Sequence, residues 1–344
     1  MNHRIRIALA SLTLLALSLA CASSIVGGEP QSATSSKPLA FDVVTPTPAP
    51  TPTPAPASCP IVTDKILTAA EEGGQSFGEL ILNDDIYLVK YQVDGEEIKE
   101  PNYENFSDQF QPLRDDWGTH MRIWEYFRAL IPADQRTMLA EYIISTDGTD
   151  GLLAAVGQTD SDPDLWMLQV DIADTDDNFE LTYTLLHEFG HLLTLGPAQV
   201  SPSLAVFNDP YNEDVYFREA SACPNYFPGE GCANTDSYID DFYDRFWDRL
   251  YAEWVKINFA ENEDDYYDQL KEFYKKYEDR FVTEYAATSP EEDIAESFSF
   301  FIFSAKPAGD AILEEKILFF YKYPELVELR EVILNNVCSR FPAQ

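Results

Sequence analysis

The sequence predicts an α+β fold in which a small mixed sheet comes first and a mainly helical lower lobe follows. Up to residue 172, short runs of β-branched and aromatic residues lie between turn residues, a pattern typical of strands. From residue 178 onward, apolar residues recur every three or four positions, which favours helices. A composition of 45% hydrophobic and 13% aromatic residues suffices for a large core. One long helix, directly after the sheet, connects the two parts.

Turn residues and alternation place the strands. The sequence predicts a strand pair in a small N-terminal region, a further short strand after the Asp94-Gly95 turn, and three more strands before residue 173. An amphipathic helix over residues 121–130 separates the two groups. Apart from the short strand after the turn, the expected strands cover residues 79–83, 86–92, 139–145, 152–156 and 165–172.

Capping and stop signals bound the long helix. Asn178 or a neighbouring Asp can cap its start, apolar residues follow at helical spacing, and Gly196 comes directly after the last turn. Because apolar residues surround this helix on nearly all sides, we expect it to be buried. A second helix begins at Pro290 with Ser289 as its N-cap. Further helices are expected between residues 238 and 285 and over residues 311–320 and 324–337.

The long helix carries the most informative motif of the chain, His187-Glu188-Phe189-Gly190-His191. Two histidines four positions apart stand one above the other on a helix, so both can bind one metal ion, and Glu188 faces the same cleft. The chain has only four histidines, and this motif uses two of the three outside the leader. The pattern predicts a zinc site with its own general base. Two ordinary, partly buried helix histidines are the alternative.

A catalytic zinc ion normally takes three protein ligands and one water molecule, so a third ligand must come from another segment. The candidates are His120, the only other histidine outside the leader, and Glu292 or Glu296, which share one helix face. Glu292 also has a structural alternative, because it can close a capping box with Ser289. A packed or helix-capping role is the alternative for His120.

The region from Tyr285 to Phe298 resembles the second motif of the glutamate-zincins (gluzincins), the metallopeptidases of the anthrax lethal factor and Pro-Pro endopeptidase kind. In that motif a tyrosine is followed, after six residues, by a zinc-binding glutamate and then by a nearby Ala-Glu and an aromatic residue. The resemblance implies that Glu292 is the third zinc ligand and that Glu296 contacts a ligand histidine. It also implies that Tyr285 donates a hydrogen bond to the transition state. Only this region, the long helix and the order of elements between them are covered.

The same resemblance implies a zincin-like metallopeptidase fold, in which residues 152–156 form the edge strand above the zinc. An unpaired strand edge beside a cleft is a template to which an extended peptide can add. Asp293 and Ile294 stand where the family usually has two aromatic residues. This departure leaves Glu296 open as the ligand in place of Glu292.

Together these residues predict a zinc-dependent peptidase. Zinc lowers the pKa of its water molecule, and Glu188 would take the proton as the water attacks a peptide carbonyl. Tyr285 would stabilise the oxyanion. We expect a peptide or protein substrate and a monomer. One rival is a surface domain that keeps the scaffold but binds a ligand without cleaving it, and such a domain would not need Glu188. A structural zinc site is a third interpretation, for which His120 is the only spare histidine.

The N-terminus predicts export and lipid attachment. Arg4 and Arg6 precede an apolar run over residues 7–19 that is short for a membrane span, as in a secretory signal. Residues 18–21 resemble a bacterial lipobox, which implies a lipid on Cys21 that anchors the protein to the outside of the cell membrane. Ordinary cleavage nearby and free secretion are the alternative.

Composition divides the rest of the chain. After the signal (residues 1–21), residues 22–58 are rich in Ser, Thr, Pro and Ala, which cannot build a core and favours an extended polyproline II tether. A proline-rich recognition ligand is the alternative, although basic and aromatic anchors are missing. We expect a small β-containing N-terminal region over residues 59–113 and a zincin-like catalytic domain over residues 114–344.

The cysteines agree with an exported protein. Of five cysteines, four remain once Cys21 carries lipid, an even set that suits an oxidising compartment. Cys223 and Cys232 lie close together among Pro and Gly residues, so a local bridge is the economical pairing. Cys59 and Cys338 bracket the folded region, and their bridge would close a very long loop. Structural zinc thiolates are the alternative, although the typical CxxC pairs are absent.

The chain is strongly acidic, with 60 Asp and Glu against 23 Lys and Arg and a net charge of −37. Nucleic acid is therefore excluded as a partner, because phosphate binding needs a basic face. Acidic loops at residues 160–164 and 171–177 offer oxygen ligands for Ca²⁺, with solvated turns and helix caps as the alternative. The only expected membrane contact is the N-terminal lipid.

Overall fold

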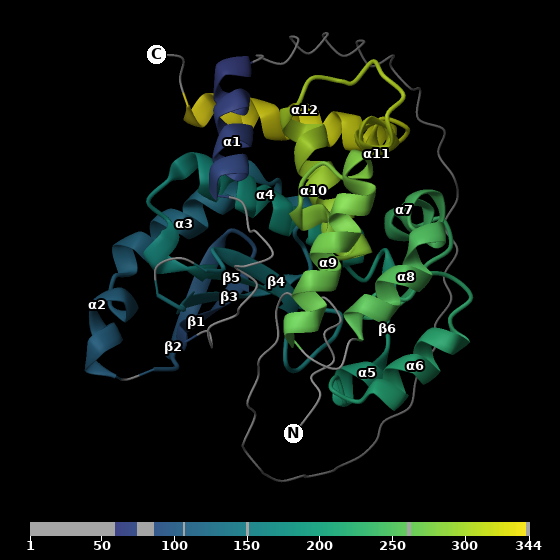
Figure 1. Cartoon of the computed structure of the whole chain (residues 1–344). Helices are drawn as coiled ribbons and strands as arrows, with labels where there is room; N and C mark the ends of the chain where they lie inside the picture. The colour runs from purple at the N-terminus through teal and green to yellow at the C-terminus, as the bar shows by residue number, and fades with distance from the viewer. Residues whose placement is uncertain (1–58, 74–85, 106, 149–150, 260–262, 342–344) are drawn as a thin grey trace, which may run out of the picture. The chain divides into compact units, whose positions relative to one another are not determined.

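The computed structural model describes residues 59–73, 86–105, 107–148, 151–259 and 263–341. The expected signal, lipobox and tether lie outside the described residues, as does the strand expected at residues 79–83. The described residues form an α+β fold with a five-stranded mixed sheet and many helices (Figure 1). The predicted α+β class is therefore confirmed.

The five strands are ordered β2-β1-β3-β5-β4. β3 and β5 run parallel, and the other neighbouring pairs are antiparallel. Because β1 pairs with β3, the N-terminal strands share one sheet with the strands that lead to the long helix. β4 forms one edge of the sheet, as predicted. The strands span β1 (Ile86–Asp94), β2 (Glu97–Tyr103), β3 (Leu139–Thr146), β4 (Ala154–Gln158) and β5 (Trp166–Asp171).

Most strand bounds follow the sequence pattern. Gly95 makes the turn between β1 and β2 with a φ of 62°, a conformation that glycine adopts without steric cost. β3 and β5 begin and end within one residue of the expected strands. The backbone N–H of Leu152 donates to the Asp147 carboxylate and not to a carbonyl group of a neighbouring strand. β4 therefore starts two residues later than expected, at Ala154.

The first helix of the described chain was not predicted from the sequence. α1 (Pro60–Gly73) lies in a region where we expected only strands. It packs against two central helices, α4 (Asn178–Leu195) and α10 (Pro290–Phe303), with Ile66 and Ala70 buried. Burial of the apolar face that contains Ile66 and Ala70 stabilises α1. Alternation rules do not detect such a face in a short helix.

Two disulfides match the expected pairings, and the zinc-thiolate alternative is therefore wrong. Cys59, directly before α1, bridges to Cys338, and Cys223 bridges to Cys232. The first bridge spans 279 residues and fastens both ends of the folded region. In the chain-entropy model, closing a loop this long stabilises a fold by on the order of 5 kcal/mol. Disulfides of this kind are typical of an oxidising, extracellular environment.

Side-chain caps begin the two central helices, α4 and α10. Asp177 caps α4 by accepting hydrogen bonds from the backbone N–H groups of Phe179 and Glu180, and α4 has the predicted bounds. Ser289 caps α10 in the same way through the N–H of Glu292. The other elements are α2 (Gln111–Arg114), α3 (Trp117–Leu130), α5 (Leu204–Asn208), α6 (Glu213–Ala222), α7 (Tyr238–Phe246), α8 (Asp248–Asn258), α9 (Glu263–Tyr277), α11 (Ile312–Phe320), α12 (Pro324–Arg340) and the strand pair β6 (Val200–Pro202) and β7 (Gly231–Ala233).

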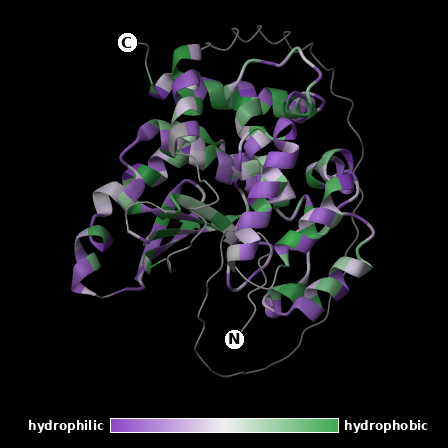
Figure 2. Ribbon diagram, in the orientation of Figure 1, coloured by the Kyte–Doolittle hydropathy of each residue, from purple (hydrophilic) through white to green (hydrophobic). Residues whose placement is uncertain are grey.

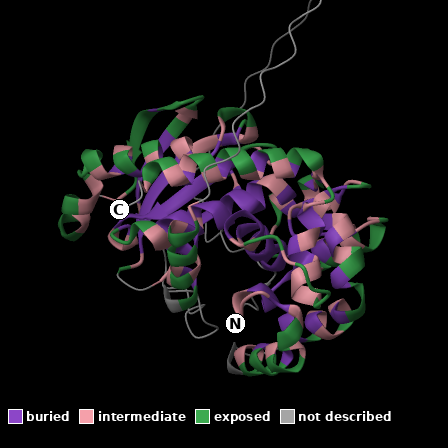
Figure 3. Cartoon of the chain, turned by 90° about the horizontal axis from the view of Figure 1, so that it is seen from above, coloured by how far each residue is buried: buried purple, intermediate pink, exposed green. Residues whose placement is uncertain are grey.

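The core lies between the sheet and the two central helices. α4 and α10 pack against each other and are buried along nearly their whole length, and Figure 3 shows the sheet and central helices as buried and the outer helix faces as exposed. Figure 2 shows hydrophobic and hydrophilic residues side by side on the outer helices, as amphipathic helices require. Within the described part of the chain, none of the helices combines the length and apolar character needed to cross a membrane.

Candidate metal centre

The site is built where α4 crosses α10. Gly190 of α4 lies against Ala295 of α10, so closely that a Cβ atom on Gly190 would sit 3.1 Å from the Ala295 Cα atom. The absence of a side chain on Gly190 thus permits the two backbones to approach. This contact brings the histidines of α4 and the glutamates of α10 to one place, although more than 100 residues separate them in the chain.

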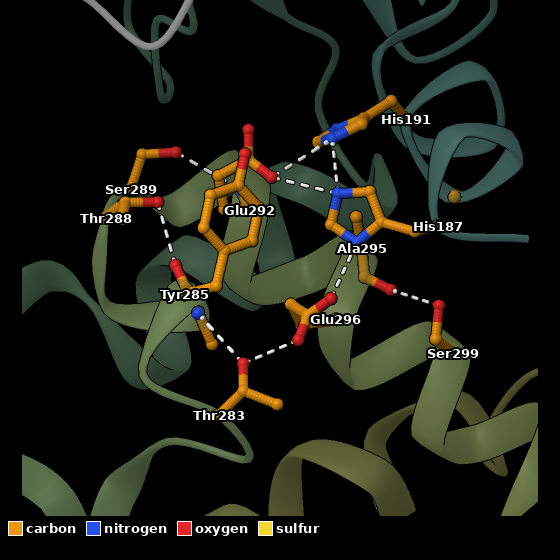
Figure 4. A network of polar contacts seen from close by, with 12 residues as sticks. His187, His191, Thr283, Tyr285, Thr288, Ser289, Glu292, Ala295, Glu296 and Ser299 are labelled. Atoms are coloured by element: carbon orange, nitrogen blue, oxygen red, sulfur yellow. Dashed lines mark hydrogen bonds and ion pairs between the residues drawn. The ribbon is translucent and has the colours of Figure 1, made fainter. Parts of the chain in front are cut away.

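Three side chains converge there. The Nε2 atom of His187 lies 2.9 Å from Oε2 of Glu292 and 3.0 Å from Nε2 of His191 (Figure 4). The Nε2 atom of His191 lies 3.3 Å from the same Glu292 oxygen. All three side chains are buried, and together they form a group that could hold a metal ion.

The donor atoms fit a small tetrahedral cation. An ion bound at about 2.0–2.1 Å by nitrogen and oxygen donors would hold neighbouring donors about 3.3–3.4 Å apart. The observed separations of 2.9–3.3 Å require the side chains to spread by only roughly a few tenths of an ångström. Moreover, two imidazole Nε2 atoms at hydrogen-bonding distance need a proton or a cation between them.

Glu296 lies on the far side of His187 from the other two donors. Its Oε1 atom lies 2.8 Å from the Nδ1 atom of His187, and its Oε2 atom accepts a hydrogen bond from the Thr283 hydroxyl at 2.5 Å. A proton on Nδ1 is thereby directed to the carboxylate, which leaves the Nε2 lone pair of His187 for a metal ion. The two glutamates therefore have different places: Glu292 among the converging donors and Glu296 behind a histidine.

The charges of the three converging groups support one another. Burial alone would raise the pKa of Glu292, but His191 and His187 outweigh burial and hold it well below its ordinary value. Burial would lower the pKa of His187, but its hydrogen bonds to Glu292 and Glu296 raise it well above the usual range. A carboxylate that stays ionised in a buried site is a strong attractor for a cation.

Glu188 lies beside this group without belonging to it. Its side chain is buried, and burial raises the pKa of the carboxyl to about 7, although His191 and His187 oppose the shift. It accepts a hydrogen bond from the backbone N–H of Val156 in β4. A carboxyl with a pKa near neutrality is suited to accept a proton and to return it.

Tyr285 reaches the site from the turn that precedes α10. Its ring centre lies 5.8 Å from that of His187, and Figure 4 shows the ring alongside Glu292. Burial and the neighbouring carboxylates, Glu292 first among them, raise the pKa of Tyr285 well above its ordinary value. The hydroxyl therefore stays protonated and can donate a hydrogen bond.

A cavity of about 310 Å³ adjoins the metal-binding group. His187, Glu188 and Tyr285 line it, together with residues from the end of α1 and from α4. A substrate group in this cavity would lie next to all three side chains. No sequence pattern predicts this cavity, because segments distant in the chain form its walls.

His120 does not belong to the metal-binding group and is packed within the fold, as the alternative interpretation predicted. Its ring is fully buried, with Nδ1 2.7 Å from the Tyr91 hydroxyl and Nε2 2.8 Å from the Leu113 carbonyl oxygen. The cap of α3 is Asp116, not His120. Both ring nitrogens of His120 are thus used within the fold.

Asp293, which departs from the gluzincin pattern, has a structural role that sequence reasoning missed. Its carboxylate accepts a hydrogen bond from Trp247 Nε1 at 2.7 Å and pairs with the ammonium group of Lys316. Asp293 is fully buried and Lys316 is 1% exposed. Burial raises the pKa of Asp293 to about 6, against the opposing effect of Lys316. The pair fixes the first turn of α10, next to Glu292.

The acidic loop after β5 contains the turns and caps expected as the alternative to calcium. Asp171 accepts hydrogen bonds from the backbone N–H groups of Asp147 and Ala173, each at 2.7 Å. Asp147, Asp171 and Asp174 together form a second group of carboxylates that could hold a metal ion. Each oxygen of Asp171 thus accepts one backbone hydrogen bond, as the turn-and-cap alternative expects, while the carboxyl also belongs to this metal-capable group.

Comparison with models of protein families, with curated proteins and with solved structures gives no match for this chain. The interpretation of the site therefore depends on its own geometry and chemistry.

Proposed function

We propose that this protein is a zinc-dependent peptidase with a zincin-like catalytic domain. The observation that carries the proposal is the convergence of His187, His191 and Glu292. The group adjoins a cavity that a separate buried carboxyl, Glu188, helps to line. A metal site that only stabilises the fold does not require a neighbouring carboxyl with a pKa near neutrality. Hydrolysis, in contrast, needs a general base at that position.

Each residue of the site has a separate role in the proposed hydrolysis. His187, His191 and Glu292 would hold the zinc ion, which supplies Lewis acidity and an acidified water molecule. Glu188 accepts a proton from the attacking water and delivers it to the leaving amine. Glu296 keeps the ring of His187 oriented through its Nδ1 atom. The Tyr285 hydroxyl donates a hydrogen bond to the developing oxyanion.

The edge strand offers a place for the substrate backbone. β4 is an edge of the sheet, and the N–H of Val156 already reaches Glu188. An extended peptide paired with this edge would pass next to the carboxyl and the metal-binding group. This route agrees with the edge strand that the gluzincin resemblance implies.

We place the enzyme outside the cell. The two disulfides support an oxidising compartment, and the N-terminal sequence supports attachment through lipid on Cys21 with residues 22–58 as a tether. Labelled lipid should attach to the wild type and not to Cys21→Ser, which should appear in the medium. Lipid-free wild type found only in the medium would remove the tether from the proposal.

A digest of an unbiased peptide library tests the activity. The purified protein should cleave a subset of peptides, lose this activity after dialysis against a chelator, and regain it with about one equivalent of zinc. Cleavage that persists without metal would contradict the proposed chemistry. An inert protein at full zinc occupancy would favour a domain that binds a ligand without cleaving it.

A further inference from the structure

Two acidic residues flank Glu292 in the first turn of α10, and each has a partner outside the helix. Asp293, which follows Glu292, accepts a hydrogen bond from the indole of Trp247. Glu291, which precedes it, accepts a hydrogen bond at 2.5 Å from the hydroxyl of Tyr226. Successive residues of a helix point about 100° apart. The two contacts therefore hold this turn from either side and fix the direction of the Glu292 side chain.

The contact between Tyr226 and Glu291 is buried. Each residue is 5% exposed. The ring of Tyr226 is stacked on Tyr243 with the ring centres 4.2 Å apart, and it meets Tyr251 edge-on at 5.6 Å. The ring cannot turn away without losing these contacts, and a buried carboxylate that loses a hydrogen bond is costly. The pair thus joins α10 to the segment that carries Tyr226.

That segment is a loop that the disulfide between Cys223 and Cys232 closes. The backbone of Tyr226 is held at two points. Its N–H donates to the carboxylate of Asp240 at 2.8 Å, and its carbonyl oxygen accepts from the N–H of Ala233 at 2.9 Å. The loop contributes none of the three converging donors of the metal-binding group. Its contact with the site is therefore indirect, through Glu291.

A second residue of the loop also lies beside the metal-binding group. Burial raises the pKa of Glu230 to about 7, the charge of Glu291 adds to this rise, and His191 opposes it. Charged groups influence a pKa in this way at short range. Tyr226 and Glu230 thus place both parts of the loop next to the site.

We propose that Tyr226 is a positioning residue of the zinc site. Through Glu291 it holds the first turn of α10 in the rotation that points Glu292 at the two histidines, and the disulfide-closed loop holds Tyr226. The inference rests on the zinc ion of the proposed function and not on peptide cleavage. Without the hydroxyl all three donors remain, but Glu292 is less restricted, so more order must be gained when the ion binds.

Zinc binding by the native protein tests the proposal. Tyr226→Phe should raise the zinc dissociation constant about tenfold, the lower end for partners of metal ligands. It should also alter the visible absorption of the Co²⁺-substituted protein, which depends on ligand geometry. Tyr238→Phe is the matched control, because it loses a tyrosine hydrogen bond to Glu325 on α12, and it should change neither. A Tyr226→Phe protein that is less stable but keeps the wild-type zinc constant and cobalt spectrum would overturn the proposal.

Variants of Glu291 test whether Tyr226 acts through it. Glutamine keeps an oxygen that can accept from the hydroxyl, so Glu291→Gln should bind zinc nearly as the wild type does. Glu291→Ala should weaken binding at least as much as Tyr226→Phe. The two losses should not add in the double variant, because both remove the same contact. Additive losses, or equal losses in the glutamine and alanine variants, would overturn this hydrogen bond as the route.

Opening the loop tests the role of the disulfide. Cys223→Ser with Cys232→Ser should weaken zinc binding in the same direction as Tyr226→Phe, and an unchanged zinc constant would overturn the part assigned to the bridge.

The outcomes also separate this proposal from the peptidase function. Weaker zinc binding in Tyr226→Phe with an inert peptide digest would support the positioning role and contradict the peptidase. Peptide cleavage by a Tyr226→Phe protein with the wild-type zinc constant would do the reverse, and a wild type that binds no zinc would contradict both.

Discussion

Gly190 of α4 packs directly against Ala295 of α10, and this contact holds the helices close enough for the histidines to meet Glu292. A Cβ atom on Gly190 would lie 3.1 Å from the Cα atom of Ala295 and 3.3 Å from its Cβ atom, so a side chain there requires α10 to give by a few tenths of an ångström. The spacing of the metal-binding group therefore depends on a glycine that bears no ligand.

Enlarging this contact should weaken the metal site. We expect Gly190→Val to lower the free energy of unfolding by about 1–3 kcal/mol, as overpacking does, and to weaken zinc binding. Chemical denaturation and zinc titration measure both effects. Gly118→Ala is the control, because a Cβ there meets only Asp116 at 3.5 Å and alanine favours a helix. Unchanged stability and metal affinity in Gly190→Val would show that the helix contact does not set the site geometry.

The two glutamates of α10 should respond differently to substitution. Glu292→Gln removes a converging donor and should weaken zinc binding by more than about 100-fold. Glu296→Gln removes the negative charge behind His187 but no converging donor, and it should weaken zinc binding by about 10- to 100-fold. Competition with a fluorescent chelator measures both constants. The reverse order would make Glu296 the ligand, the possibility that Asp293 and Ile294 left open in the sequence.

Tyr285→Phe should slow turnover without removing the metal. Loss of one oxyanion donor typically costs about 10²–10³ in kcat, because the hydrogen bond forms fully only in the transition state. Steady-state kinetics should show the change in kcat, with zinc content and KM nearly constant. Tyr103→Phe, an exposed tyrosine on β2, controls for the loss of a hydroxyl. A purely structural Tyr285 would instead change stability and leave kcat unaffected.

The buried Lys316–Asp293 pair should be costly to break. Lys316→Met leaves Asp293 charged and buried, which we expect to destabilise the metal-free protein by about 3–5 kcal/mol at pH 8. Burial already raises the pKa of Asp293 to about 6 with the lysine present. Without it the folded-state pKa rises further, so protonation at pH 5 should relieve much of the loss.

Denaturation of that variant at pH 5 and pH 8 measures the effect. Adding Asp293→Asn to Lys316→Met removes the stranded charge and should recover part of the stability at pH 8. A loss that is the same at both pH values and persists in the double variant would point to packing, not charge.

Sequence reasoning succeeded where local signals were strong. The bounds of α4 follow from its cap, its apolar spacing and Gly196, and the motif on it could be assigned from spacing alone. Ser289 and Pro290 likewise fixed the start of α10. The disulfide pairings followed from loop length and position in the chain.

The sequence could not show how distant segments meet. α1 was missed because its stability comes from packing on α4 and α10, and the role of Asp293 was missed because its partner Lys316 lies 23 residues away. Periodicity finds which face of a helix is buried, but it does not identify what covers that face.

The most direct test of the account is the activity of Glu188→Gln at matched zinc occupancy. Glutamine keeps the shape of the side chain but cannot accept the proton from water, and zinc does not require this residue. We expect zinc content and thermal stability close to those of the wild type, and peptide cleavage lower by about 10²- to 10⁴-fold. Cleavage by the variant at the wild-type rate, with one zinc ion bound to each protein, would contradict the role of Glu188 and the mechanism built on it.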